Sequence, residues 1–284
     1  MLKITVPATT ANLCVGFDCI GMALSIYNEY GFELSVHDDV SSFEERYQTN
    51  NLVLESYKHY FNKYNLEYKP VKITLIKQDI PTSRGLGSSA ACIVAGVYAA
   101  SILSDSYSSF EMILNACVDI EGHPDNVLPA LEGGMVASFK GKEEYQWIKY
   151  SPSYKLSYHL LIPDFELSTN EARRVLPDSY SKQDVVHNLG RMACLPKIIE
   201  GGYFNMLRDL FDDKIHEPYR FGLIPNASKI KESFNTNYAA LCISGAGPTL
   251  LVIGQEGLML NDDICGFKTR CVLPDMQGVK IENV

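Results

Sequence analysis

The stretch Pro81–Ala91, which reads PTSRGLGSSAA, runs directly into the apolar segment CIVAGVYAASIL at residues 92–103. Within it, the six residues GLGSSA (85–90) contain two glycines and two serines. The first turn of a helix leaves several backbone N–H groups without a partner, and the helix dipole adds about half a positive charge there. Glycines let the backbone approach an oxyanion closely, and serine hydroxyls can donate to phosphate. The stretch therefore predicts an anion-binding loop followed by a buried helix over residues 88–103.

Two common nucleotide-binding fingerprints do not fit this loop. The dinucleotide fingerprint needs a strand that leads almost directly into its first glycine, whereas seven residues separate Lys77 from Gly85. No strand follows that would carry its acidic residue, because residues 104–110 read SDSYSSF. The Walker A motif needs a lysine where this chain has a serine. A serine-capped helix after a glycine turn is the structural alternative, but a cap needs fewer glycines and serines than this loop contains.

Hydrophobic periodicity predicts the elements of the first half of the chain. Strands are expected at residues 2–8, 27–37, 71–77 and 133–139. The spacing of apolar residues predicts a helix over residues 51–65. An S-x-x-E capping box formed by Ser108 and Glu111 predicts a further helix that ends at Gly122.

A polar and charged stretch, Lys140–Lys155, separates two apolar regions and is the candidate domain boundary. We therefore expect one domain at residues 1–150 and a second at 151–284. In the second domain we expect strands at residues 156–164, 238–244 and 249–254, and helices from Ser168 and through 193–211. Strands and helices alternate without the regular rhythm of a parallel sheet, which favours an α+β fold.

The composition limits the partners of the protein. A formal net charge of −9 over 284 residues argues against a nucleic acid or an anionic membrane surface. No apolar run approaches the length of a bilayer span, and the first residues lack the apolar core of a signal peptide. The eight cysteines include no C-x-x-C pair. We expect most of them to be small core residues in a reducing cytoplasm, without a structural zinc site.

Four blocks of the sequence resemble the motifs of a known family. Pro81–Ala91 resembles the phosphate-binding motif P-x-x-x-G-L-G-S-S-A-A of the GHMP small-molecule kinases. Val6–Gly21 resembles the N-terminal motif of the homoserine kinases in that family, and Glu121–Gly134 is similar to their H-x-D-N-V-x-P segment. Ser244–Gly254 resembles the glycine-rich third motif. The blocks occur in the family's order and span nearly the whole chain, and together they are highly specific.

The resemblance implies a two-domain α+β fold, with an N-terminal domain like that of ribosomal protein S5 and a ferredoxin-like C-terminal domain. It implies that ATP and Mg²⁺ bind between the domains. The implied reaction is transfer of the γ-phosphoryl group to the side-chain hydroxyl of L-homoserine, which gives O-phospho-L-homoserine for threonine biosynthesis. Analogy with the family also suggests a homodimer.

The resemblance also implies roles for individual residues. The residues implied to hold ATP are Pro81, Thr82, Ser83, Arg84, Gly85, Leu86, Gly87, Ser88, Ser89, Ala90 and Ala91, with Asn51 near the adenine. The residues implied to bind the substrate are Asn12, Asp18, His123, Asn126, Thr169, Arg173 and Arg220. The implied metal ligands are Ser89 and Glu121, and the implied catalytic residues are Glu121, Asp125, Asn126 and Arg173.

The chemistry of these side chains suits the implied roles, because phosphoryl transfer depends on positioning and charge neutralisation. A carboxylate suits the substrate's ammonium group, and a guanidinium suits its carboxylate. We expect stabilisation of the transition state to dominate, with the proton taken by phosphate or solvent, and Asp125 as the alternative base. The sequence departs from the family at Cys14, where a glycine is usual, and in the short spacing between Glu121 and His123.

Ordinary roles compete with these assignments. Asn12 suits a turn, Glu121 suits an exposed helix end, and Arg173 suits a salt-bridged helix face. At the level of the whole protein, the alternatives are another GHMP kinase, such as a mevalonate or phosphomevalonate kinase, and a catalytically inactive binding module. The intact glycine loop, Ser89 and Glu121 argue against the inactive module.

Overall fold

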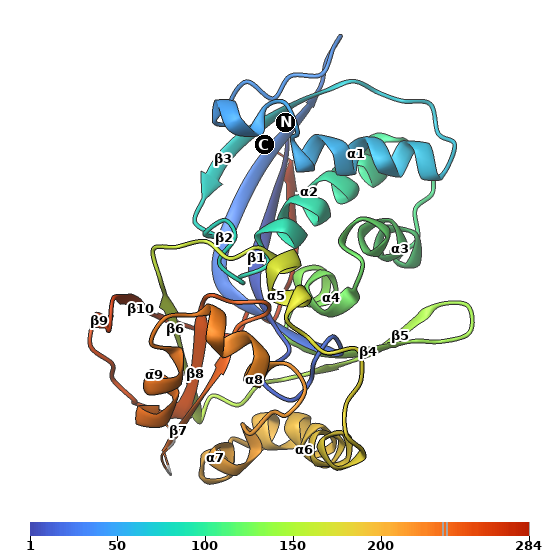
Figure 1. Ribbon diagram of the computed structural model, residues 1–284. Coiled ribbons are helices and arrows are strands. Elements are labelled where there is room, and N and C mark those ends of the chain that lie inside the picture. The colour runs from blue at the N-terminus through green and yellow to red at the C-terminus, as the bar shows by residue number, and fades with distance from the viewer. Residues whose placement is uncertain (235, 237, 284) are drawn as a thin grey trace.

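The computed structural model describes residues 1–234, 236 and 238–283, and two antiparallel sheets organise this part of the chain (Figure 1). The first sheet has the strand order β11-β1-β2-β4-β5. β3 is outside this order and pairs with β2, which also pairs with β1 and β4. Its strands are β1 (Leu2–Ala11), β2 (Ile20–Leu34), β3 (Val71–Gln78), β4 (Met135–Lys140), β5 (Tyr145–Tyr150) and β11 (Lys280–Asn283).

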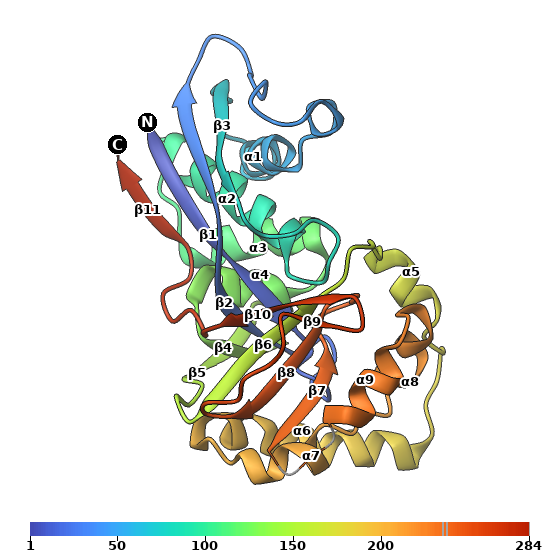
Figure 2. The same ribbon diagram turned by 90° about the vertical axis from the view of Figure 1, so that its left-hand side faces the viewer.

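Four helices cover one face of the first sheet (Figure 2). They are α1 (Leu52–Lys63), α2 (Ser88–Leu103), α3 (Phe110–Glu121) and α4 (Pro124–Glu132). The central helix, α2, contacts the other three helices as well as β1 and β2. Its residues from Ala90 to Ala100 are almost all buried, because the segment is apolar around its whole circumference. The start of α2 is thereby fixed in position by the core behind it.

The second sheet has the order β7-β8-β6-β10-β9. Its strands are β6 (Leu156–Ile162), β7 (Ala239–Ile243), β8 (Leu250–Gln255), β9 (Asp263–Ile264) and β10 (Phe267–Val272). The helices of this half are α5 (Thr169–Arg174), α6 (Lys182–Gly201), α7 (Leu207–Leu210), α8 (Glu217–Arg220) and α9 (Ala227–Phe234). Short 3-10 turns occupy Glu45–Tyr47, Phe204–Met206 and Phe221–Leu223.

The chain passes from the first sheet to the second within the polar stretch at residues 140–155. β5 lies inside this stretch and pairs with β4, so the crossing falls between Tyr150 and Leu156. After β10 the chain returns, and β11 pairs with β1 at the edge of the first sheet (Figure 2). The first sheet is therefore built from both ends of the described chain.

Most of the expected elements are confirmed, but the strand expected at residues 27–37 runs from Ile20 to Leu34, and three further expectations are wrong. The N-cap of α3 is Ser109, whose hydroxyl accepts from the backbone N–H of Met112, because Ser108 instead bonds the Tyr60 hydroxyl. The helix expected through 193–211 ends at Gly201, since Gly202 adopts a left-handed conformation with φ of 66°.

The third wrong expectation concerns the cysteines. Only three of the eight are buried, because four others lie at exposed positions and Cys92 is partly buried against the core. The buried thiols are Cys14, Cys117 and Cys242, and the exposed ones are Cys19, Cys194, Cys265 and Cys271.

Within the described residues, no helix combines the length and apolar character needed to cross a membrane.

Candidate active site

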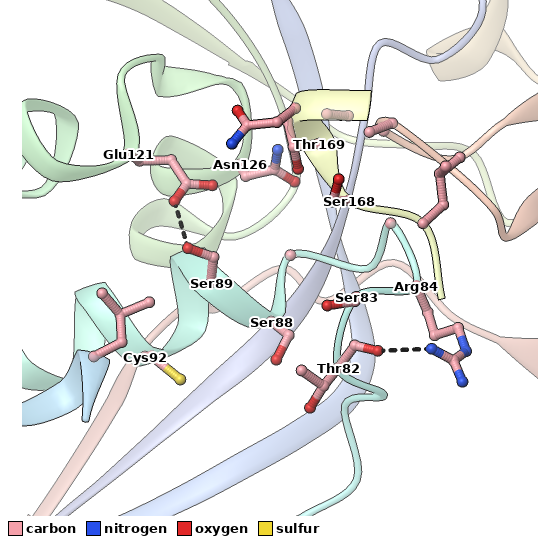
Figure 3. A pocket seen from close by; sticks show the side chains of 18 of the residues that line it. Thr82, Ser83, Arg84, Ser88, Ser89, Cys92, Glu121, Asn126, Ser168 and Thr169 are labelled. Carbon is pink, nitrogen blue, oxygen red and sulfur yellow. Dashed lines mark hydrogen bonds between the residues drawn. The ribbon is translucent and has the colours of Figure 1, made fainter. Parts of the chain in front are cut away.

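A cavity of about 450 Å³ lies where the two halves of the chain meet (Figure 3). The first half contributes the glycine loop, the loop between β1 and β2, the start of α1, and the junction of α3 and α4. The second half contributes α5, the end of α8 and the loop before β8. The cavity therefore brings together all four sequence blocks that carry the family resemblance.

The glycine loop presents free backbone amides to this cavity. Gly87 is the N-cap of α2 and has no side chain to cap the helix. Among the described residues, the amides of Ser88, Ser89 and Ala90 make no hydrogen bond with the protein. The helix dipole and these unpaired donors make the start of α2 a suitable site for an anion.

Glycine is required at two positions of the loop. Gly85 and Gly87 have φ values of 72° and 68°, which belong to the left-handed region. A Cβ atom on Gly85 would lie 2.4 Å from the carbonyl oxygen of Ser244, and one on Gly87 would lie 1.9 Å from Oγ1 of Thr9. The backbone conformation and the close packing, against the second half at Gly85 and against β1 at Gly87, exclude a side chain at both positions.

Two oxygen ligands meet beside the glycine loop. Oγ of Ser89 donates to Oε2 of Glu121 at 2.8 Å, and Figure 3 shows the two side chains facing one another. Burial raises the pKa of Glu121, and the hydrogen bond from Ser89 opposes this shift. Within the described residues, no cluster of three His, Cys, Asp or Glu side chains is suited to hold a metal. A hydroxyl and one carboxylate fit Mg²⁺, which takes its other ligands from phosphates and water.

The loop after β1 is held in an unusual backbone conformation. Asn12, Leu13, Cys14 and Asp18 all have positive φ values, between 40° and 73°. Such residues carry backbone strain, and strain of this kind is concentrated at functional sites. Asn12 anchors the loop, because its Nδ2 donates to the carbonyl of Gly245 at 2.8 Å and its Oδ1 accepts from the N–H of Asp18 at 3.0 Å. Asn12 therefore connects the loop to the second half of the chain.

Asp18 makes an ion pair with Arg173 of α5. The two guanidinium nitrogens donate to the two carboxylate oxygens at 2.9 and 3.0 Å. Both side chains line the cavity and are about one third exposed, at 34% and 36%. The pair is therefore accessible to a ligand that enters from the solvent.

Arg220 at the end of α8 is a buried cation beside the cavity. It is 2% exposed, and its guanidinium donates to the carbonyls of Ala172 and Gly245 at 3.2 and 3.1 Å. No carboxylate of the described residues pairs with it within 4.0 Å. Burial, followed by repulsion from Arg173, lowers the pKa of Arg220 to about 10. Because an isolated buried charge is costly, an anion bound in the cavity beside Arg220 would stabilise the guanidinium.

Three predicted residues lie together at the start of α4. Nδ1 of His123 is hydrogen-bonded to Oδ1 of Asp125, which is 2% exposed. Burial acts to lower the pKa of His123, but the bond with Asp125 outweighs it, so the pKa is raised. Oδ1 of Asn126 accepts from Oγ1 of Thr9 at 2.7 Å. His123, Asp125 and Asn126 all line the cavity.

The structure places most of the predicted site residues at the cavity. Those that line it are Asn12, Asp18, Asn51, Thr82, Ser83, Arg84, Gly85, Gly87, Ser88, Ser89, Glu121, His123, Asp125, Asn126, Thr169, Arg173 and Arg220. Four residues of the predicted loop are not in its lining: Pro81, Leu86, Ala90 and Ala91. The side chains of Leu86, Ala90 and Ala91 belong to the core.

Arg84 and Asn51 have local bonding roles. The guanidinium of Arg84 donates to the carbonyls of Thr82, Pro163 and Asp164, and in Figure 3 it lies well away from Ser88 and Ser89. It thus joins the glycine loop to the segment after β6. Asn51 is the N-cap of α1, and its Oδ1 accepts from the N–H of Leu54.

Sequence reasoning missed several residues around the site. Thr9 supports the loop, since its N–H donates to the carbonyl of Leu86 and its hydroxyl bonds Asn126. Phe17 lies beneath both arginines, with its ring centroid 5.8 Å from Cζ of Arg173 and 5.1 Å from Cζ of Arg220. Both residues fall inside the Val6–Gly21 block, so the only available signal was their place in that block.

Known proteins share this fold and these sequence blocks. The GHMP kinases N terminal domain profile matches residues 51–134, which contain the glycine loop. A homoserine kinase of Clostridium novyi (strain NT) is 42% identical and covers 88% of this chain and 86% of its own. One of Clostridium kluyveri is 37% identical and covers 100% of this chain and 99% of its own. The crystal structure of homoserine kinase from Cytophaga hutchinsonii has a TM-score of 0.81 at 24% identity, covering 99% of this chain and 97% of its own.

A glycine loop with free backbone amides at the start of a buried helix, in a cavity between two α+β halves, is the arrangement of a small-molecule kinase. The matched profile and the shared fold agree with that class. The identity to the clostridial relatives, over nearly the full length of both chains, narrows the class further. The chain belongs to the homoserine kinases of the GHMP kinase family.

Proposed function

We propose that this enzyme transfers the γ-phosphoryl group of Mg-ATP to the side-chain hydroxyl of L-homoserine, which gives O-phospho-L-homoserine for threonine biosynthesis. One observation carries the choice of substrate. An accessible carboxylate, Asp18, and two guanidinium groups, Arg173 and Arg220, line the cavity together. This charge pattern is complementary to a zwitterionic amino acid, which presents an ammonium group and a carboxylate a short distance apart.

The nucleotide would bind on the side of the first half. The free amides of Ser88 and Ser89 would hold the phosphates, and Asn51, the N-cap of α1, lines the same cavity and would lie near the adenine. Ser89 and Glu121 would hold Mg²⁺, which when bound neutralises charge on the transferring phosphate. The first domain, residues 1–150, would thus provide the nucleotide site.

The amino acid would bind between the halves. Its ammonium group would pair with Asp18, and its carboxylate with Arg173 and Arg220 of the second domain, residues 151–284. Asn12 and Thr169 also line the cavity. These contacts would hold the hydroxyl toward the phosphates, and positioning of this kind is the main contribution a kinase makes.

The proton of the hydroxyl needs an acceptor. Asp125 is buried, and its Oδ1 already bonds His123. We therefore assign the proton to the transferring phosphate or to solvent, with Asn126 and Arg173 stabilising the charge that develops on the phosphoryl group.

The test is an ADP-release assay with purified protein, Mg-ATP and a panel of homoserine, mevalonate, galactose and serine. We expect homoserine alone to stimulate ADP release strongly. Serine is the matched control, because it keeps the zwitterion and shortens the side chain by one methylene. Stimulation by mevalonate instead of homoserine would overturn the substrate assignment.

A further inference from the structure

His216, which directly precedes α8, connects the two sides of the amino-acid subsite. Its ring is fully buried, and it stacks on the ring of Phe17 with a centroid separation of 5.1 Å and an interplanar angle of 24°. Nε2 lies 2.6 Å from the carbonyl oxygen of Cys14, and Nδ1 lies 3.3 Å from Nη1 of Arg220. The ring thus touches the loop that carries Asp18 and, on its other side, the buried arginine.

The two partners determine the protonation state of the His216 ring. A carbonyl oxygen can only accept, so the hydrogen must be on Nε2, which also faces Oδ2 of Asp213 at 3.9 Å. A guanidinium can only donate, so Nδ1 must carry a lone pair toward Arg220. Only the neutral Nε2–H tautomer satisfies both contacts. His216 therefore gives Arg220 an acceptor that carries no charge.

The backbone of His216 is itself fixed. Oδ2 of Asp213 accepts from the N–H groups of Ile215, His216 and Glu217 at 3.1, 2.7 and 2.7 Å. Asp213 is 4% exposed, so these bonds are shielded from water. The ring of His216 consequently has little freedom to move away from Arg220.

Arg220 depends on neutral acceptors for its orientation. Its guanidinium is held by two backbone carbonyls and by Nδ1 of His216, and no carboxylate pairs with it among the described residues. A carboxylate in place of His216 would neutralise the guanidinium and remove its attraction for a substrate. A neutral acceptor aligns the guanidinium and leaves its charge for the ligand.

We propose that His216 is a positioning residue for the amino-acid subsite: its neutral ring orients the Arg220 guanidinium and holds the Cys14–Asp18 loop at a fixed distance from it. This inference rests on the proposed homoserine site. It assigns His216 no contact with substrate and a role only in placing Arg220 and the Cys14–Asp18 loop. A substitution of His216 should therefore change the KM for homoserine and leave the KM for ATP unaffected.

Three substitutions separate the contacts of the ring. His216→Phe keeps the stacking on Phe17 and removes both hydrogen bonds. His216→Asn places an amide oxygen where Nδ1 lies, and so can keep the acceptor for Arg220. His216→Gln can keep the donor to Cys14 but not the acceptor at Nδ1. His159→Phe is the matched control, because His159 is also buried, at 4% exposure, and its Nε2 has no hydrogen-bond partner among the described residues.

The readouts are the KM values for homoserine and for ATP, together with thermal unfolding. We expect His216→Phe to raise the KM for homoserine by about 10- to 100-fold, as for loss of a hydrogen bond to a charged group. The KM for ATP should stay within about twofold, since a local subsite effect does not reach the nucleotide. His216→Asn should recover most of the loss, and His216→Gln less. An unchanged homoserine KM in His216→Phe, or an equal rise in both KM values, would contradict the proposal.

A second measurement does not depend on the substrate. The ¹⁵N shifts of the labelled imidazole rings should report His216 as the Nε2–H tautomer, with the signal assigned by its absence in His216→Asn. A proton on Nδ1 would overturn the proposal even if the enzyme phosphorylates homoserine. If instead wild-type protein released no ADP with homoserine, the proposed function would fail while the tautomer measurement still tested the contact to Arg220.

Discussion

Asp18 and Arg173, which are 155 positions apart in the chain, are joined by two hydrogen bonds across the cavity. Each group is the natural partner of one charge of an amino-acid zwitterion. An incoming amino acid can therefore exchange with the pair, its ammonium group taking Asp18 and its carboxylate taking Arg173. A ligand with only one of these charges would break the pair and leave one member without a partner.

Replacement of Arg173 by alanine should remove a charged partner of the substrate carboxylate. We expect kcat/KM for homoserine to fall by an amount equivalent to roughly 2–5 kcal/mol, as for truncation of one member of a hydrogen-bonded charge pair. The KM for ATP should change little. Arg174→Ala is the matched control, because Arg174 is the exposed neighbour on the same helix and does not line the cavity. Equal activity of the two variants would show that the carboxylate site is misassigned.

Replacement of Gly85 by alanine should damage the phosphate loop. The new Cβ would meet two backbone carbonyl oxygens, at 2.4 and 2.7 Å, and the residue would keep a left-handed φ. We expect stability to fall by about 1–3 kcal/mol, with at least a tenfold rise in the KM for ATP. Gly257→Ala is the control, since Gly257 has a φ of 81°, but no atom of the described residues other than its chain neighbours lies within 4 Å of its Cβ position. Both variants should be compared by urea unfolding and by initial rates at varied ATP. A larger effect in Gly85→Ala than in Gly257→Ala would show that the steric overlap at Gly85 costs more than the positive φ alone.

The contact between Ser89 and Glu121 predicts how activity depends on Mg²⁺. Glu121→Gln removes the charged ligand, and Ser89→Ala removes the hydroxyl, so both should raise the Mg²⁺ concentration needed for half-maximal rate. We expect the larger effect, about tenfold or more, from Glu121→Gln, since loss of a ligating carboxylate weakens the site most. Ser88→Ala is the control, because the described structure gives that hydroxyl no contact with Glu121. A Mg²⁺ requirement that Ser88→Ala shifts as much as Ser89→Ala would contradict the assignment.

The raised pKa values of two tyrosines, Tyr27 and Tyr64, predict how the free energy of unfolding changes at alkaline pH. Burial, together with the bond to Asp275, raises the pKa of Tyr27 to about 12, and burial raises that of Tyr64 to about 12. An unfolded tyrosine ionises near pH 10, so the stabilising contribution is complete below pH 10 and is lost as the pH rises toward 12. Urea unfolding from pH 8 to 11.5 should show this decline. The stability difference between wild type and Tyr27→Phe should shrink over the same range, and a constant difference would argue against the assigned shift.

Local pattern was sufficient to predict the part of the site that is continuous in sequence. The helix over residues 88–103 is predicted from its uniform apolar character. The anion-binding loop before it is predicted from its glycines and serines at a helix start. Errors arose where neighbouring signals compete. Two adjacent serines, Ser108 and Ser109, both precede α3, and only the tertiary contact of Ser108 with Tyr60 decides which one caps the helix.

The rest of the site depends on distances that no local pattern contains. The bond of Asn12 to Gly245 spans 233 positions, and that of His216 to Cys14 spans 202. Family resemblance could place Asn12 in the site, because it lies in a motif. The resemblance assigned no role to His216, because the contacts of this residue with Cys14 and Phe17 form only when the start of α8 packs against the loop after β1.

The pairing of β11 with β1 has a consequence for how the protein can be made and divided. During synthesis on a ribosome, the first sheet stays without this edge strand until residues 280–283 emerge, long after β1 to β5 are available. A fragment cut after residue 150 would expose the backbone of β1 as an unpaired edge, which invites association with other chains. Splitting the gene at that point should therefore yield an aggregation-prone piece, whereas a circular permutant that joins β11 directly to β1 would preserve the edge.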